Sequence, residues 1–310
     1  MRTRREFLEA MAIASASPFT LPLDKLWAGP GAADKCIDAH VHVWTPDTAQ
    51  FPLDKGFSLE DMQPKSFTPP ELFVHSRPAG VDRIVLIQMS FYRFDNRYML
   101  SVIEQHPGVF AGVAIVDEDQ ANLAEHMKRL RSGGVRGFRL YADKSKAEAW
   151  SKSAAMKAMW SHAADLDQAM CLLANPDALP AIQAMCREFP KTKVVIDHFA
   201  RVGMSGPIQA NDLDNLCRLS DHEKVFVKTS AFYALGKKKP PYTDLVPMIV
   251  RLVQEFGSDR LMWASDCPYQ VQGEHDYASS IGLVRDHLPS LSDAQRRDLL
   301  ANTAERLFFA

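Results

Sequence analysis

The segment Asp38-Ala39-His40-Val41-His42 holds the residues of this chain that are most able to do chemistry. It lies within an apolar run typical of a β-strand, and strand side chains alternate between two faces. Asp38, His40 and His42 are therefore expected to point the same way. Two imidazoles that project from one strand can share a divalent metal ion. We interpret Asp38, the deepest of the three, as a supporting or structural carboxylate.

A second apolar run, residues 260–265, leads directly into Asp266. If the first and last strands are neighbours in a closed barrel, this carboxylate meets the histidine pair. A carboxylate beside two imidazoles predicts a hydrolytic or lyase site at the mouth of a barrel.

The elements that must position these groups alternate between strand-like and helix-like segments. Such alternation predicts parallel strands with right-handed crossovers, and eight units favour a single (β/α)8 TIM barrel of the α/β class over an open sheet. The insertion at residues 46–70 follows the first strand and is expected to form a lid or wall over the mouth. The predicted strands are residues 36–43, 83–89, 110–116, 135–140, 169–174, 193–198, 224–230 and 260–265, and predicted helices include 122–131, 154–167, 179–188 and 245–256.

Polar residues stand at nearly every predicted strand end, which is where catalytic groups of such barrels lie. A barrel that served only as a scaffold has no need of this coincidence. Taken alone each residue is ambiguous, since His198 could be a core histidine and Lys228 could extend its ammonium to solvent. Besides the residues above, the strand ends supply Gln88, Arg139, Tyr141, Asn175, Asp197, His198, Lys228 and Ser230.

The bulk composition narrows the function classes. The chain has 310 residues, of which 46% are hydrophobic and 24% charged, and its formal net charge is −2. No basic stripe is present, so nucleic acid is not an expected partner, and a small-molecule substrate is. The five cysteines are scattered and form no C-x-x-C pair, which argues against a disulfide framework and a cysteine-rich zinc site. A homo-oligomer remains open.

The first 33 residues have the pattern of a twin-arginine signal peptide. Residues 3–8 read Thr-Arg-Arg-Glu-Phe-Leu and precede a weakly apolar, Ala/Ser-rich stretch at residues 10–23. This pattern predicts that residues 34–310 form the mature domain and are exported to the periplasm. The alternative is a chance Arg-Arg before an amphipathic helix. The stretch is too short and too interrupted for a stable transmembrane span.

Four motifs in order, Asp-x-His-x-His-x-Trp, Val-Ile-Asp-His-Phe, Lys-Thr-Ser and Ser-Asp-Cys-Pro, resemble the amidohydrolase-related family of metal-dependent hydrolases, and most of all its lactonase-like branch. The resemblance runs from about residue 35 to the C-terminus. It implies a TIM barrel with a divalent metal, expected to be zinc, at His40, His42 and Asp266, completed by water or His198. Some members work without a metal, so a metal-free site stays open.

One departure from that family separates two reactions. Its metal-dependent decarboxylases usually place a histidine at the end of strand five, where this chain has Asn175. The lactonase-like branch typically lacks that histidine too. The sequence therefore favours lactone hydrolysis over decarboxylation.

The expected reaction is hydrolysis of a lactone or related ester of a small sugar acid or carboxylic acid. Asp266 is expected to act as the general base on the attacking water and to return the proton to the leaving oxygen. His198 and Lys228 are expected to stabilise the developing oxyanion.

Substrate binding is assigned to a second group of residues. Arg139 has the fork geometry that suits a substrate carboxylate, and Gln88 and Tyr141 are the further expected contacts.

Two alternative functions remain. One is a metal-dependent non-oxidative decarboxylase of an aromatic or unsaturated acid, and the other is a non-catalytic barrel that binds a small ligand.

Overall fold

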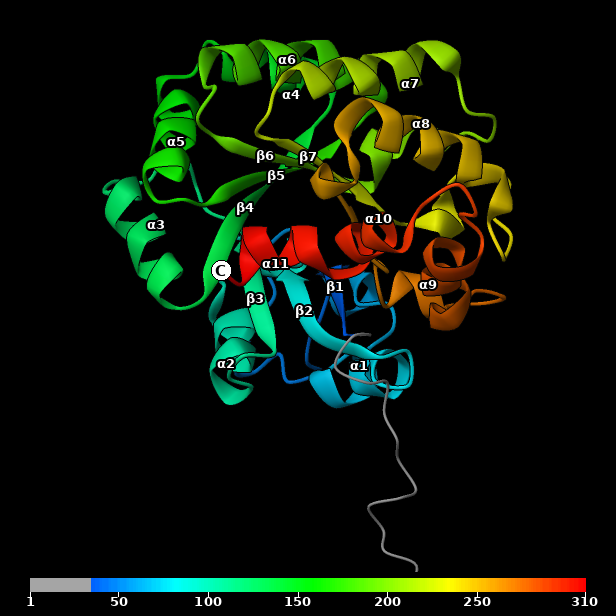
Figure 1. The fold of residues 1–310 in the computed structure, drawn as a ribbon. Coiled ribbons are helices and arrows are strands. Elements are labelled where there is room, and N and C mark those ends of the chain that lie inside the picture. Colours follow the sequence, from blue (N-terminus) through cyan, green and yellow to red (C-terminus); the bar gives the residue numbers. More distant parts are fainter. Residues whose placement is uncertain (1–34) are drawn as a thin grey trace, which may run out of the picture. The chain divides into compact units, whose positions relative to one another are not determined.

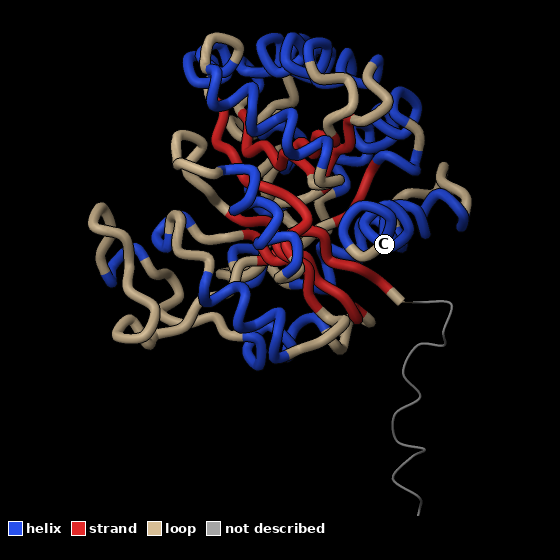
Figure 2. The backbone as a smooth tube through the Cα atoms, turned by 90° about the vertical axis from the view of Figure 1, so that its left-hand side faces the viewer, coloured by secondary structure: helices blue, strands red, loops and turns tan. Residues whose placement is uncertain are grey.

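A computed structural model describes residues 35–310, whose eight parallel strands form one sheet in the order β1 to β8. Figure 1 shows helices on the outside of the strands, and Figure 2 shows the strands gathered at the centre. This arrangement is the predicted (β/α)8 barrel. The predicted signal peptide lies outside the described residues and stays a prediction.

Most element boundaries fall within a few residues of the predicted ones, and residues 169–174 and 179–188 match at both ends. The strands are β1 (Cys36–Val41), β2 (Val81–Ile87), β3 (Phe110–Ala114), β4 (Val135–Ala142), β5 (Ala169–Ala174), β6 (Lys193–Ile196), β7 (Val225–Thr229) and β8 (Leu261–Trp263). The helices are α1 (Pro69–Ser76), α2 (Arg97–Gln105), α3 (Leu123–Ser132), α4 (Lys144–Trp150), α5 (Ala154–Asp165), α6 (Leu179–Glu188), α7 (Ala210–Cys217), α8 (Val246–Phe256), α9 (Tyr277–Asp286), α10 (Asp293–Arg297) and α11 (Thr303–Phe308).

Backbone hydrogen bonds between β1 and the segment after β8 close the ring. The amide of Asp266 donates to the carbonyl of His40 at 2.9 Å, and the amide of His42 donates to the carbonyl of Cys267 at 2.8 Å. The closure is therefore made by the residues that the sequence singled out. Asp266 lies beside the histidine pair because backbone pairing holds it there.

The opposite end of the barrel is closed by α11, which packs against β1, β4 and β8. Since these strands lie on different sides of the ring, one helix covers its amino-terminal end. Leu307 and Phe308 join a buried cluster with Ile37 and Val85 inside the barrel. The amino-terminal end is thus filled by apolar packing, and polar groups gather at the carboxyl ends of the strands, as in other barrels of this kind.

Strict alternation fails in β1, and this corrects the expected direction of Asp38. A register shift against β2 between Asp38 and Val41 places an extra residue in β1. Asp38 therefore lies against α9, where it accepts a hydrogen bond of 2.7 Å from the hydroxyl of Tyr277. It also accepts from the amides of Ser265 at 2.9 Å and His40 at 3.2 Å. Its predicted structural role fits these contacts, but it does not face the site beside His40 and His42.

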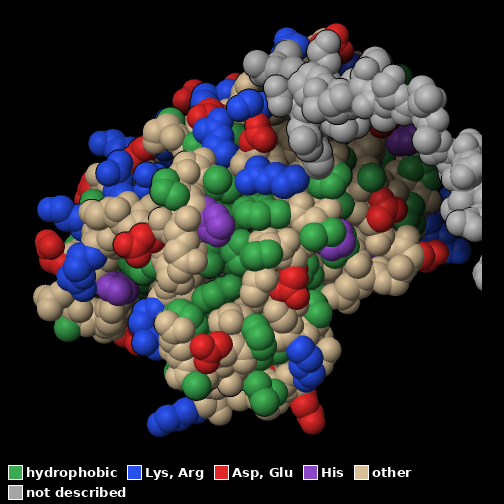
Figure 3. Space-filling view, turned by 90° about the horizontal axis from the view of Figure 1, so that it is seen from below, with side chains coloured by type: hydrophobic (Ala, Val, Ile, Leu, Met, Phe, Trp, Pro, Cys, Tyr) green, Lys and Arg blue, Asp and Glu red, His purple; other side chains and the backbone are tan. Residues whose placement is uncertain are grey.

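The long insertion after β1 is anchored to the barrel. Trp44 and Phe67 pair through two backbone hydrogen bonds, and the indole of Trp44 donates to the carbonyl of Pro64 at 2.9 Å. Figure 3 shows acidic, basic and apolar side chains interspersed over one face of the molecule. Within residues 35–310, no helix combines the length and apolar character needed to cross a membrane.

Candidate active site at the carboxyl end of the barrel

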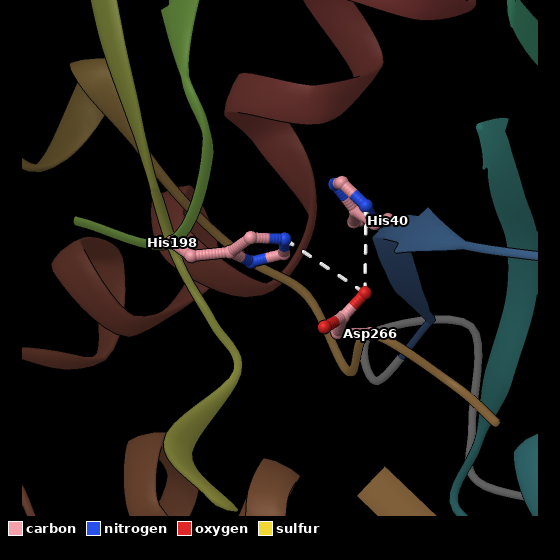
Figure 4. Close-up of side chains that lie close together, drawn as sticks. All are labelled: His40, His198 and Asp266. Carbon is pink, nitrogen blue, oxygen red and sulfur yellow. Dashed lines mark ion pairs between the residues drawn. The ribbon is translucent and has the colours of Figure 1, made fainter. Parts of the chain in front are cut away.

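Three histidines and one aspartate converge where the first and last strands meet. His40 and His42 come from the end of β1, His198 follows β6, and Asp266 follows β8. All four residues are buried, with at most 5% of each residue exposed. Figure 4 shows His40 and His198 pointing toward Asp266 from separate elements. The topology therefore brings together residues separated by up to 226 positions, as the closed-barrel prediction required.

The spacing of the donor atoms fits a tetrahedral metal ion. His40 Nε2 lies 3.3 Å from His42 Nε2, and these atoms lie 3.5 and 3.4 Å from Asp266 Oδ1. Ligands at about 2.1 Å from a tetrahedral ion are about 3.4 Å apart. His198 Nε2 is slightly farther, at 3.8 Å from the same oxygen, and His40, His198 and Asp266 also have donor atoms within 4.8 Å of one another. The donor set and its spacing fit a divalent ion.

Contacts of the Nδ1 atoms of His42 and His198 determine that their Nε2 atoms face the site. His42 Nδ1 lies 2.9 Å from the carbonyl of Ile87 and donates to it, so Nε2 is the nitrogen that faces Asp266. His198 Nδ1 lies 2.7 Å from Ser230 Oγ, which donates to the carbonyl of Lys228. The Nε2 atom of His198 is the one that faces Asp266, at 3.8 Å, and the predicted oxyanion-stabilising role stays a prediction.

A buried ion pair lies behind His40. Lys228 Nζ is 2.9 Å from Asp197 Oδ1 and 3.2 Å from His40 Nδ1, and both charged side chains are fully buried. Burial raises the pKa of Asp197, but Lys228 and His40 outweigh it, so that pKa lies well below its ordinary value. Burial and the adjacent Lys228 hold the pKa of His40 well below its ordinary value. His40 is therefore neutral at pH 7, as a metal ligand must be.

This arrangement corrects the role expected of Lys228. Its ammonium is not among the groups that line the cavity next to Asp266, and its contacts are Asp197 and His40. It cannot reach a substrate oxyanion in that position. Lys228 instead holds His40 in place. Burial also lowers the pKa of His198, which keeps that imidazole neutral.

Asp266 is held in one orientation by contacts to both of its oxygens. Its Oδ1 faces the histidines, and its Oδ2 accepts a hydrogen bond of 2.7 Å from the hydroxyl of Tyr233. Burial raises the pKa of Asp266. The neighbouring His198, His42 and His40 lower it by more than burial raises it, so the pKa lies below its ordinary value. The carboxylate is therefore ionised at neutral pH and can accept a proton.

The backbone at the site adopts an uncommon conformation. His198, Phe199, Ala200 and Arg201 have φ angles of 52°, 54°, 52° and 60°, and Asp266 has a φ of 66°. Left-handed backbone costs about 1–2 kcal/mol per residue for side chains of this kind. Strain of this sort persists where surrounding contacts impose it, and it concentrates at functional sites.

The cavity next to Asp266 has a volume of about 260 Å³. Arg139 lines it, with Nη1 3.4 Å from His42 Nε2, and Tyr141 lines an adjoining cavity. Gln88 does not reach either cavity. Its side-chain amide donates to the carbonyls of Arg93 at 3.3 Å and Asp95 at 2.7 Å, so it braces the loop after β2 and the role in substrate binding expected of it is not supported.

Sequence reasoning missed three residues that line this cavity, namely Tyr233, Tyr269 and Arg201. Arg201 and Tyr233 each follow a predicted strand end by three residues, and Tyr269 follows one by four. Polar residues in the turns just beyond the strand ends, as well as at the ends themselves, are the sequence feature that identifies them.

Known proteins share this architecture. A family model described as Amidohydrolase matches residues 37–310. The chain is 29% identical to the L-fucono-1,5-lactonase of Burkholderia ambifaria over 259 residues, covering 78% of this chain and 84% of that protein. It is 26% identical to the 2-pyrone-4,6-dicarboxylate hydrolase of Comamonas testosteroni, covering 88% of this chain and 90% of that protein.

Among solved structures, an amidohydrolase from Burkholderia multivorans with bound zinc matches with a TM-score of 0.74. The match covers 88% of this chain and 98% of that one at 21% sequence identity. At that identity the likeness shows the fold.

Proposed function

This chain is a member of the amidohydrolase family and a hydrolase, and we propose that it opens a lactone or a related ester of a small carboxylic or sugar acid. The observation that carries the proposal is Asp266. Its carboxylate is ionised, is fixed by Tyr233 and faces the Nε2 atoms of three histidines beside a cavity. The two curated relatives named above act on lactone-type substrates, which supports the same class here.

In the proposed reaction, Asp266 Oδ1 takes a proton from water as the water attacks the ester carbonyl. The same carboxyl returns that proton to the ring oxygen as the carbon–oxygen bond breaks, so one residue serves as base and then as acid. Arg139 is the cation nearest to the histidine pair on the cavity wall, and its planar guanidinium suits the substrate carbonyl or carboxylate oxygens. Leu173 and Met204 line the same cavity and limit the water in it.

A divalent ion fits the donor set. His40, His42 and Asp266 would hold it, with His198 adjacent, and it would supply Lewis-acid polarisation of the carbonyl and a lowered pKa of the attacking water. We propose zinc, since imidazole and carboxylate donors in tetrahedral spacing are typical of it and the solved Burkholderia multivorans relative contains it.

The test measures acid release from a panel of sugar lactones and unsaturated dicarboxylate lactones by the purified full chain. Turnover of at least one is expected, and Asp266→Asn should lower it at least about a thousandfold because the base is lost. The matched control is Asp177→Asn, which changes an exposed carboxylate after β5 and should keep full activity. Near-normal turnover by Asp266→Asn contradicts the assignment of the base.

Metal content is measured on the same preparations. About one equivalent of zinc is expected in the parent and is expected to be lost in a His40→Ala/His42→Ala variant. A fully active, metal-free parent would exclude the metal and leave Asp266 to act with the histidines alone. Release of carbon dioxide from aromatic acids, with no hydrolysis of any lactone, would overturn the hydrolase proposal in favour of a decarboxylase.

A further inference from the structure

The mouth of the barrel holds a second, larger cavity beside the catalytic one. Its volume is about 810 Å³, against about 260 Å³ for the cavity at Asp266. Arg139 and Leu173 line both cavities, so the two spaces adjoin at β4 and β5. The catalytic cavity is below the 300–1,000 Å³ usual for small-molecule sites, and the second cavity is within that range.

Exposed apolar side chains of the described residues concentrate around these two cavities. Six large hydrophobic side chains are exposed between residues 35 and 310, and four of them line one cavity or the other. Three of the four line the larger cavity, where Phe57 and Phe94 are 38% exposed and Tyr141 is 39% exposed. A cluster of exposed apolar rings on a concave surface is the mark of a binding site rather than of chance exposure.

Polar contacts hold two of these three rings, those of Phe94 and Tyr141, in position. Arg93 lies over the ring of Phe94 at 4.7 Å, and Lys146 lies over the ring of Tyr141 at 4.6 Å. The hydroxyl of Tyr141 also accepts from the Asn175 amide at 3.4 Å. The positions of Phe94 and Tyr141 are therefore supported by the protein itself.

The rings come from different elements. Phe57 lies in the insertion after β1, Phe94 follows β2, and Tyr141 stands at the end of β4, while Trp150 of α4 completes the lining. Four aromatic side chains around one space favour a flat, π-rich occupant over a hydrated sugar. Contacts between aromatic rings are more favourable than the burial of their apolar area alone would make them. The insertion predicted to be a lid or wall supplies part of this lining.

We infer that the natural substrate is a lactone or ester that carries an aromatic substituent, with the ester group at Asp266 and the substituent in the larger cavity. The inference rests on the proposed function for the position of the ester. Adjacency across Arg139 and Leu173 is what allows one molecule to occupy both cavities.

The test compares δ-valerolactone with 5-phenyl-δ-valerolactone as substrates of the full chain. The phenyl compound is expected to have a kcat/KM at least about tenfold higher. Phe94→Ala and, separately, Phe57→Ala should remove most of that advantage and leave kcat/KM for δ-valerolactone within about twofold. Leu59→Ala is the matched control, because Leu59 is exposed but lines neither cavity. Equal kcat/KM for the two lactones, or an equal loss for both in Phe94→Ala, overturns the inference.

A binding measurement separates this inference from the proposed function. Asp266→Asn protein is titrated with 5-phenyl-δ-valerolactone by calorimetry, with and without Phe94→Ala in the same chain. At least about tenfold weaker binding in the double variant supports the aromatic site even if no lactone is hydrolysed, in which case the proposed function alone fails. Unchanged affinity in the double variant overturns the inference even if lactones are hydrolysed.

Discussion

The two halves of the barrel mouth are built on different principles. The half formed by the ends of β6, β7 and β8 holds buried charges, a buried ion pair and left-handed backbone. The half formed by the loops after β1, β2 and β4 holds exposed aromatic rings backed by surface cations. The catalytic half holds a few polar atoms in defined positions, whereas the aromatic half provides an apolar surface for contact with a ligand.

The two halves differ in the features that oppose folding. Directly after β6, β7 and β8, six residues other than glycine have positive φ angles: His198, Phe199, Ala200, Arg201, Ala231 and Asp266. Such backbone, together with buried charges, opposes folding and persists because surrounding contacts impose it. In the aromatic half the unfavourable feature is exposed apolar surface, which a bound substrate would relieve.

The largest expected effect comes from breaking the buried pair of the catalytic half. Lys228→Met leaves the charged Asp197 in the barrel interior without its ammonium partner. Breaking a buried pair in this way costs about 3–5 kcal/mol, so the free energy of unfolding measured in urea should fall by that amount. Adding Asp197→Asn removes the orphaned charge and is expected to recover at least half of the loss.

The aromatic half supplies the matched control. Arg93 pairs with Asp54 at 3.6 Å, and both side chains are partly exposed. Arg93→Met should therefore cost less than about 1 kcal/mol. If Lys228→Met and Arg93→Met lower the free energy of unfolding equally, the contrast between the two halves fails in its energetic part.

The barrel and part of the catalytic half of its mouth could be predicted from the sequence. Strand order and strand-end polarity were enough for the barrel and for the meeting of His40, His42 and Asp266, because a parallel barrel brings strand ends together. The extra residue in β1 was not predictable, since period-two alternation leaves no trace of a bulge. The role of Lys228 was missed because its partner, Asp197, comes from a different strand.

The left-handed turn after β6 shows a second limit of sequence reasoning. The residues there read Asp-His-Phe-Ala-Arg and include no glycine or asparagine, the usual markers of positive φ. Tertiary contacts impose that conformation against local preference. Of the rings of the larger cavity, the sequence indicated Tyr141, whereas Phe57 and Phe94 come from loops whose shape their sequences do not encode.

A smaller effect tests the seam between β1 and β8, on which Asp266 depends. Burial raises the pKa of Asp38 from 3.8 to about 6, although hydrogen bonds from Ser265, Tyr277 and His40 oppose the rise. Well below pH 4 both the folded and the unfolded states are protonated at this group. Between about pH 4 and 6 the unfolded state ionises first, so stability falls as pH rises and levels off above pH 6.

The measurement compares the parent with Asp38→Asn in urea at pH 4, 5, 6 and 7. The parent should lose about 2–3 kcal/mol relative to the variant across this range, the equivalent of about two pKa units. Asp177→Asn, which changes an exposed carboxylate, should show no such trend against the parent. A constant difference between parent and Asp38→Asn at all four pH values would refute the burial argument.

The smallest expected effect concerns Tyr233, which positions the general base. Its hydroxyl donates to Asp266 Oδ2 at 2.7 Å, and this contact keeps Oδ1 toward the histidines. Tyr233→Phe should lower kcat about tenfold, equivalent to about 1.4 kcal/mol and near the lower end of the range for a hydrogen bond to a charged group. KM and metal content should stay within about twofold, because the cavity keeps its ring and its ligands.

A second readout distinguishes positioning from a merely structural contribution. Loss of a hydrogen bond to the ionised carboxylate raises the pKa of Asp266, so the acid limb of the pH–rate profile should move to higher pH. The control is Tyr92→Phe, which removes a hydroxyl that bonds Thr45 in the other half of the mouth and should leave both kcat and the acid limb unchanged. A tenfold loss of kcat without movement of the acid limb would assign Tyr233 to packing, because only a contact made to the charged carboxylate links the rate to its titration.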